Sequence, residues 1–288
     1  MLKGLVVAAF GKRYEVELDD KRRISCVTRG KKTDIASGDV VEIALTDHHE
    51  GVVENISPRK TLLYRSNAFK SKLLAANVTQ IVIVLATQPS FYEALLNRCL
   101  VAAEAAGIKV LIVLNKSDLA NQEATEKLAQ YANLGYQTLL LSATHDIAPL
   151  LPYLKGEQSV MVGQSGMGKS TIINALLPHE SVRTQAFSAA LDSGKHTTTA
   201  TRLYHLDSSS TLIDSPGLQE FGLHHVSQLA LEQAFIEFRP YLGHCRFNNC
   251  KHLHEPDCAI LNQLNKAISP NRLAQYQQLS EELQRSSS

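Results

Sequence analysis

The feature that most constrains the fold is the run Gly163-Gln164-Ser165-Gly166-Met167-Gly168-Lys169-Ser170, which fits the pattern G-x-x-x-x-G-K-[ST] at every fixed position. A short apolar stretch precedes this run, and the helix-like "STIINALL" follows it. In such a strand–loop–helix arrangement, main-chain N–H groups and a helix N-terminus surround phosphate oxygens. The motif therefore predicts a phosphate-binding loop in an α/β fold.

Several side chains are candidates for phosphate and magnesium contacts. We expect Lys169 to reach the β- and γ-phosphates, Ser170 to coordinate Mg²⁺, and Thr171 to donate near the α-phosphate. In "LIDSPGL", Asp214 can hold the Mg²⁺ shell, and the N–H of Gly217 can contact the γ-phosphate. A threonine of "GKHTTT" can complete the shell, and the sequence does not choose among Thr197, Thr198 and Thr199, of which Thr198 is taken as the candidate.

A second motif, Asn115-Lys116-Ser117-Asp118, follows the apolar strand "KVLIVL" and indicates that the base is guanine. One carboxylate, that of Asp118, can accept both N1–H and N2–H₂ of guanine, whereas adenine lacks this pair of donors. Asn115 can tie neighbouring loops together, and the stem of Lys116 can lie over the base. A main-chain N–H at Ser142-Ala143 can contact guanine O6.

The order of these loops is unusual, because the base-reading loop precedes the phosphate loop. In an ordinary GTPase chain the phosphate loop comes first. Either one match is accidental, or the chain is rewired. Since the supporting loops are all present, we interpret the order as a circular permutation, in which the same strands occupy the same sheet and the chain enters at a different point.

Near-continuous apolar stretches alternate with helical patterns beyond residue 78, as in a parallel α/β sheet. Helices are expected over 91–107 and roughly 121–134. The strands are expected at 80–86, 109–115, 137–143, 158–163, 201–206 and 211–214.

The N-terminal stretch, residues 1–60, reads as five short strands separated by glycine or charged turns. This pattern favours a small closed barrel, with the OB-fold preferred and an SH3-like barrel as the alternative. Residues 1–72 hold 14 Lys+Arg and 10 Asp+Glu, against 15 and 18 in the remainder. The excess suggests an anionic partner such as nucleic acid, although a solvated surface explains it equally well. Residues 57–77 read as a basic connector.

The C-terminal part, beyond residue 226, looks helical and contains Cys245-x4-Cys250-x-His252-x5-Cys258. Three thiolates and one imidazole form a tetrahedral zinc set with no open position, so the zinc is expected to be structural. His252 is preferred, with His244 and His254 as spare candidates. The isolated Cys26 and Cys99 are expected to be small buried apolar residues.

The residue that should orient the attacking water is not obvious. Leu218 stands where Ras-like enzymes place a glutamine, and its side chain cannot hydrogen-bond to water. Nearby polar candidates are Gln219, Glu220, His224 and His225. An alternative function follows from Leu218: a nucleotide-switched RNA-binding module with little turnover.

Taken together, the motifs resemble the ribosome small subunit-dependent GTPase A family, whose members are circularly permuted bacterial GTPases. The resemblance extends over essentially the whole chain and includes "VLNKSDL", "VGQSGMGKSTIINALL", "GKHTTT", "IDSPGLQEFGL" and the cysteine–histidine cluster. Lys195 and Thr79 depart from the residues usual in the family and alter no named ligand. The family's histidine after "FGL-x" falls on His225, which the resemblance therefore implies as catalytic together with Lys169 and Thr198.

The resemblance implies a GTPase that binds the small ribosomal subunit and its rRNA, and that hydrolyses GTP to GDP and phosphate during late subunit maturation, with stimulation by the subunit. The expected fold is an N-terminal all-β OB-fold barrel that binds RNA (1–68), an α/β circularly permuted P-loop GTPase domain (69–224) and an α-helical zinc-binding domain (225–288). The cofactors are one structural Zn²⁺, and Mg²⁺ with GTP. Ordinary composition, with 44% hydrophobic and 20% charged residues and no long apolar run, predicts a cytoplasmic protein without a membrane partner. We also expect the protein to be a monomer.

Overall fold

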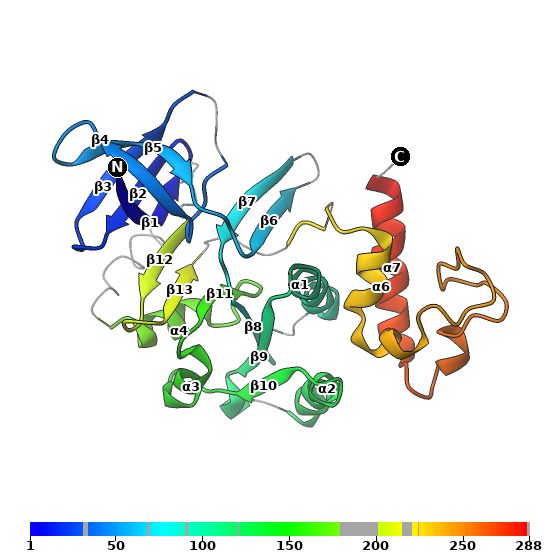
Figure 1. Ribbon diagram of the computed structural model, residues 1–288. Helices are drawn as coiled ribbons and strands as arrows, with labels where there is room; N and C mark the ends of the chain where they lie inside the picture. Colours follow the sequence, from blue (N-terminus) through cyan, green and yellow to red (C-terminus); the bar gives the residue numbers. More distant parts are fainter. Residues whose placement is uncertain are drawn as a thin grey trace.

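The chain forms a β-barrel, a helix-covered α/β sheet and a helical C-terminal region (Figure 1). The computed structural model describes residues 1–30, 34–67, 70–89, 92–119, 121–178, 201–214, 221–223 and 225–286. Within these ranges, none of the helices combines the length and apolarity that crossing a bilayer requires.

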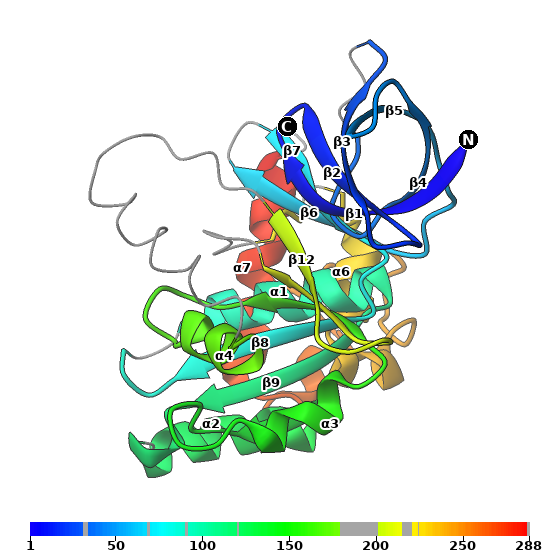
Figure 2. The same cartoon turned by 90° about the vertical axis from the view of Figure 1, so that its left-hand side faces the viewer.

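The N-terminal barrel has the five strands that the sequence predicts. They are β1 (Leu2–Phe10), β2 (Arg13–Leu18), β3 (Arg23–Thr28), β4 (Val40–Leu45) and β5 (Glu50–Ile56). The pairings run β1–β2, β2–β3, β3–β5, β5–β4 and β4–β1, so the strands close on themselves in the five-stranded arrangement of an OB-fold, and Figure 2 shows this ring. Alternate side chains point inward and form a separate small core that includes Tyr14, Ile24 and Ile43.

The α/β sheet has the strand order β10-β9-β8-β11-β13-β12. Its strands are β8 (Gln80–Ala86), β9 (Lys109–Asn115), β10 (Gln137–Leu140), β11 (Gln158–Val162), β12 (Thr201–His205) and β13 (Thr211–Asp214). All neighbours are parallel except β12 and β13. β8 is buried along its whole length, because helices cover both faces of the sheet.

Two helical layers explain why the central strands carry no polar face. One core packs Ile81 and Ile83 against α1 (Glu93–Ala106), α2 (Gln122–Asn133) and the C-terminal helices. The other packs Val82 and Val84 against the short helix α3 (Leu151–Leu154), α4 (Lys169–Leu176) and their flanking turns. Single 3₁₀ turns, η1 and η2, lie at Ser117–Leu119 and Ala148–Leu150.

The barrel and the α/β sheet share a continuous hydrogen-bonded ladder. β1 pairs with β12 in antiparallel register, with Ala8 opposite Arg202 and Ala9 opposite Thr201. The hydroxyl of Ser37 also donates to the carbonyl oxygen of Thr201 over 2.8 Å. The barrel is therefore fixed directly to a strand of the α/β sheet, which the sequence did not predict.

The predicted basic connector is instead a β-hairpin formed by β6 (Leu62–Asn67) and β7 (Lys70–Ala76). Leu63 and Leu74 are buried in the same core as α1, and this burial gives the segment a reason to fold as paired strands. The boundary expected at residue 68 falls between these two strands.

The C-terminal region contains α6 (Gln228–Ala234), η3 (Ile236–Tyr241), η4 (Leu261–Gln263) and α7 (Pro270–Ser286). The hydroxyl of Ser227 accepts from Ala230 N and caps α6. α6 packs on α1, and α7 lies beside α6 (Figure 1). The helical expectation beyond residue 226 is confirmed.

A buried charge network joins this region to the α/β sheet. Arg272 of α7 is 6% exposed, and its guanidinium donates to both carboxylate oxygens of Glu237, over 2.6 and 3.1 Å. The same guanidinium donates to Asn97 Oδ1 of α1 and lies 4.4 Å from the ring centroid of Phe235. Arg272 therefore holds α7, η3 and α1 together.

Replacement of Arg272 tests this network. Arg272→Met leaves the Glu237 carboxylate buried without its cation, so we expect the free energy of unfolding to fall by about 3–5 kcal/mol. Arg285→Met on the same helix is the matched control, because its ion pair with Glu281 is exposed and should change stability by less than about 0.5 kcal/mol. Urea denaturation followed by circular dichroism measures both, and equal losses in the two variants would contradict the assignment.

Candidate nucleotide-binding site and metal centre

The predicted nucleotide loops meet at one edge of the α/β sheet. Asn115 is the last residue of β9, the phosphate loop begins directly after β11, and Asp214 is the last residue of β13. These strands are parallel, so their carboxyl ends lie at the same edge, where open α/β sheets bind ligands. Chain order does not matter for this convergence.

Two glycines of the phosphate loop are required by close backbone packing. Gly163 has φ +152°, and a Cβ there would lie 2.3 Å from Val84 O. Gly168, with φ +89°, precedes the first residue of α4, and a Cβ there would lie 2.3 Å from Asn115 Nδ2. Glycine therefore lets the loop close against β8 and against the base-reading loop.

The amide of Asn115 links three loops. It is 2% exposed, its Nδ2 donates to Met167 O over 3.0 Å, and its Oδ1 accepts from Ala143 N over 3.1 Å. The phosphate loop, the base-reading loop and the Ser142-Ala143 loop are thus held in one arrangement by both ends of one side chain.

The base-reading carboxylate is oriented by its neighbours. Ser142 Oγ donates to Asp118 Oδ1 over 2.5 Å and lies 2.8 Å from His145 Nδ1. The hydrogen bond from Ser142 lowers the pKa of Asp118 below its usual range, so the carboxylate stays ionised. Lys116, at φ +57°, donates from Nζ to Gln88 O over 2.6 Å. His145 was not identified from the sequence, since histidine is no part of the motif.

Two opposite charges lie deeper in the site. Lys169 Nζ donates to Gly163 O and, over 2.8 Å, to Gln164 O. Burial lowers the pKa of Lys169 and raises that of Asp214, and the charge of each opposes the shift of the other. The side chain of Ser170 is exposed at the start of α4. The carboxylate of Asp214 at the end of β13 and the hydroxyl of Ser170 in the first turn of α4 are oxygen ligands of the kind that Mg²⁺ prefers, so the described residues fit this ion.

Several predicted residues cannot be placed. Thr198 and Gly217 lie outside the described residues, as do Leu218 and His224. His225 is described: its imidazole is exposed and lies against the ring of Tyr64, with 4.9 Å between ring centroids.

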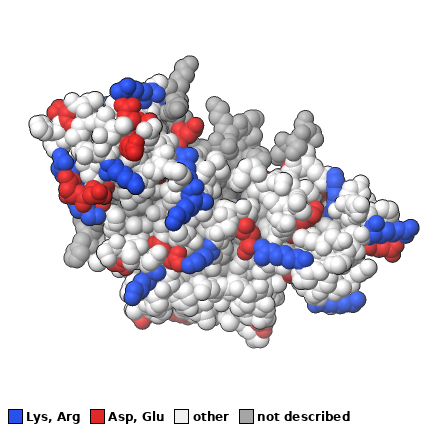
Figure 3. All heavy atoms as spheres, viewed as in Figure 1, with Lys and Arg blue, Asp and Glu red and all other residues white. Residues whose placement is uncertain are grey.

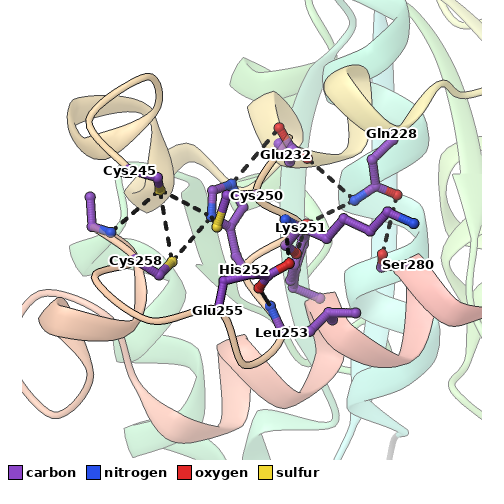
Figure 4. A network of polar contacts seen from close by, with 12 residues as sticks. Gln228, Glu232, Cys245, Cys250, Lys251, His252, Leu253, Glu255, Cys258 and Ser280 are labelled. Carbon is purple, nitrogen blue, oxygen red and sulfur yellow. Dashed lines mark hydrogen bonds and ion pairs between the residues drawn. The ribbon is translucent and has the colours of Figure 1, made fainter. Parts of the chain in front are cut away.

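The second site is the cluster of Cys245, Cys250, His252 and Cys258, whose ligand atoms all lie within 4.8 Å of one another (Figure 4). Nδ1 of His252 is 3.5, 3.5 and 3.3 Å from the three sulfur atoms, in chain order, and Cys245 Sγ is 3.8 Å from Cys258 Sγ. Tetrahedral zinc requires separations of about 3.6 Å for nitrogen–sulfur and about 3.8 Å for sulfur–sulfur pairs. The four residues can therefore hold a metal ion.

A carboxylate of α6 lies behind the histidine of the cluster. His252 is 3% exposed, and its Nε2 is 3.9 Å from Glu232 Oε2 while Nδ1 faces the sulfur atoms (Figure 4). Burial lowers the pKa of His252, which favours the neutral imidazole that a metal requires. Glu232 therefore faces the imidazole, at a separation longer than a hydrogen bond, on the side where carboxylates orient metal-bound histidines. Nothing in the local sequence pattern distinguishes Glu232 from a surface glutamate.

Charges on the barrel are mixed in sign. Figure 3 shows Lys and Arg lying beside Asp and Glu on the barrel face that it draws. Several basic side chains are paired, such as Arg23 with Glu15 at 3.0 Å and Arg22 with Asp20 at 2.7 Å. These ion pairs give parts of the barrel surface a mixed rather than a uniformly basic character.

Replacement of the base-reading carboxylate tests the guanine assignment. Asp118→Asn exchanges an acceptor of two donors for an amide, so we expect weaker binding of GTP and a preference for xanthosine triphosphate. One lost charge-assisted pair should shift the ratio of dissociation constants at least about 100-fold. Equilibrium titration with both nucleotides measures this ratio. Asp146→Asn, in the neighbouring loop, is the control, and an unchanged GTP preference in Asp118→Asn would refute the assignment.

Comparison with known proteins agrees with this geometry. A family model described as RsgA GTPase matches residues 56–224. A Nitrosospira multiformis protein named small ribosomal subunit biogenesis GTPase RsgA is 52% identical over 281 residues, covering 96% of this chain and 90% of the relative. A Nitrosomonas europaea protein of the same name is 47% identical over 291 residues, covering 99% and 93%.

Solved structures show the same architecture. The crystal structure of YjeQ from Thermotoga maritima matches with a TM-score of 0.76 and 30% identity, covering 98% of each chain. YloQ, described as a circularly permuted GTPase, matches with a TM-score of 0.71 and 28% identity, covering 99% of this chain and 96% of its own. The permuted order of the nucleotide loops is thus shared with these proteins, and the chain belongs to the RsgA GTPase family.

Proposed function

We propose that this GTPase binds the small ribosomal subunit and hydrolyses GTP to GDP and phosphate during late maturation of that subunit, with stimulation by the subunit. The observation that carries the proposal is the convergence of Asp118, Asn115 and Lys169 at one sheet edge. The names of the relatives, small ribosomal subunit biogenesis GTPase, support the choice of partner. The protein acts in the cytoplasm as a monomer.

The roles of the site residues follow from their positions. Asp118 and the Ser142-Ala143 loop select guanine, while Lys169 and the main chain of residues 163–171 hold the phosphates. Ser170, Asp214 and Thr198 would hold Mg²⁺, which would supply positive charge to the phosphates. The N–H of Gly217 contacts the γ-phosphate.

Hydrolysis requires a group that acts on water, and we assign this role to His225. The water oxygen forms a bond to the γ-phosphorus while the bond from that phosphorus to the β–γ bridging oxygen breaks, so GDP leaves with the electron pair. A neutral imidazole orients the water and accepts its proton, which Leu218 cannot do.

The three parts of the chain have separate roles in this proposal. The OB-fold barrel, residues 1–68, contacts rRNA, and residues 69–224 form the permuted GTPase. Residues 225–288 form a zinc-binding domain that also contacts the subunit. The cluster of three sulfurs and one nitrogen favours Zn²⁺, and four protein ligands leave no open position, so the ion is structural.

Removal of the imidazole tests the catalytic assignment. We expect His225→Ala to lower the subunit-stimulated rate of GTP hydrolysis about 100-fold, the size of a typical acid–base contribution, without changing the affinity for GDP. His244→Ala is the control, because His244 is exposed and lies outside the metal cluster. Phosphate release with and without small subunits measures the effect. An unchanged stimulated rate would remove His225 from the mechanism, and no single-turnover hydrolysis in the wild-type complex would favour the nucleotide-switched RNA-binding module instead.

Removal of a thiol tests the metal assignment. We expect Cys250→Ser to reduce bound zinc from one equivalent to less than about a tenth and to lower the unfolding temperature of the C-terminal region, because a metal-built loop loses its folding energy with the ion. Cys99→Ser, an isolated buried cysteine of α1, should retain the zinc. Elemental analysis of the purified proteins measures the content, and full zinc retention in Cys250→Ser would contradict the assignment.

A further inference from the structure

His225 is held in a defined place by the β6–β7 hairpin. Its imidazole lies against the ring of Tyr64, with the centroids 4.9 Å apart and the planes inclined by 48°. The backbone just before it is tied to the same residue, because Gly222 N donates to Tyr64 O over 3.1 Å. One residue of the hairpin therefore contacts both the main chain and the side chain of this segment.

Apolar anchors on both sides of His225 fix the segment against the hairpin. Phe221 and Leu223 are each 2% exposed, and Val226 is 6% exposed. All three are buried in the same core as Leu63, the neighbour of Tyr64. His225 itself is exposed between these anchors, so its ring can leave Tyr64 without opening the core.

The hairpin is not part of the phosphate-binding edge. Its strand β7 ends at Ala76 and leads into the amino end of β8. The phosphate loop follows β11, whose carboxyl end lies beside the carboxyl end of β8. β8 has 7 residues, a length of about 20 Å. Tyr64 pairs with Leu73 close to the base of the hairpin, after a register shift that re-aims the strand. The ring that contacts His225 therefore comes from an element tied to the far end of the sheet.

We propose that Tyr64 is a positioning residue that holds His225 on the hairpin in the free protein, and that displacement of the hairpin by the bound subunit releases the imidazole for hydrolysis. This inference rests on the proposed catalytic role of His225. Aromatic pairs of this kind bias an equilibrium about 2- to 10-fold. The contact accounts for part of the difference between free and stimulated rates, and Tyr64 acts only through His225.

Two variants of Tyr64 separate the ring contact from its hydroxyl. Tyr64→Ala removes the ring, and we expect the GTP turnover of the free protein to rise about 2- to 10-fold, with an equal fall in the stimulation factor. Tyr64→Phe keeps the ring and is expected to behave as the wild type. Tyr64→Ala combined with His225→Ala should show no rise, because the released group is absent.

A second readout follows the contact itself. The imidazole proton resonances of His225, assigned by comparison with His225→Ala, should carry the ring-current shift of a neighbouring aromatic ring in the wild type and in Tyr64→Phe, and lose it in Tyr64→Ala. Tyr64→Leu, which keeps apolar bulk, repeats the kinetic test if Tyr64→Ala lowers the unfolding temperature.

The outcomes distinguish this inference from the function on which it rests. If His225→Ala retains the stimulated rate, the catalytic role of His225 fails and the Tyr64 inference fails with it. If His225→Ala loses stimulation while folded Tyr64→Ala and Tyr64→Leu keep or lower the free rate, the Tyr64 inference alone is overturned. A rise that persists in the double variant also overturns it.

Discussion

The nucleotide site depends on the amide of Asn115, because its two ends hold together loops that are far apart in the chain. Nδ2 bonds to the phosphate loop at Met167 O, and Oδ1 bonds to the loop at Ala143 N. The approach is so close that Gly168 has no room for a Cβ. These contacts form between loops at the carboxyl edge of parallel strands, so they do not depend on the order of the loops along the chain. Circular permutation leaves the site unchanged for this reason.

What permutation does change is the set of elements joined to the nucleotide-binding strands. β12 follows the segment that carries Thr197–Thr199, and it pairs with β1 of the barrel. β13 ends at Asp214, and the chain beyond it continues through His225 into α6 and the metal cluster. β12 is therefore connected to the barrel by hydrogen bonds. β13 is connected to the C-terminal region by the chain that follows it. In this arrangement, a change at the nucleotide can reach the barrel and the C-terminal region by separate routes.

The sequence predicted those elements that a short stretch of neighbouring residues determines. Buried strands such as β8 are continuous apolar runs, the phosphate loop is a fixed pattern of glycines, and the metal cluster follows from ligand spacing. The β6–β7 hairpin was missed because its basic residues were taken as the mark of a connector, while its fold depends on buried Leu63 and Leu74. The β1–β12 pairing joins residues nearly two hundred positions apart and leaves no local signal. His145 and Glu232 each lie beside another site residue, so their positions become visible only when the chain is folded.

The short helix α6 connects the two sites mechanically. It begins at Gln228, three residues after His225, and its Glu232 faces the histidine of the metal cluster. Its 7 residues span about 10 Å and pack on α1. Arg272 resists such movement, because it ties α7 and η3 to Asn97 of α1 through a buried charge. His225 can therefore be displaced from Tyr64 while Val226 stays buried and the metal region stays fixed, whereas a displacement that moves Val226 also moves the start of α6.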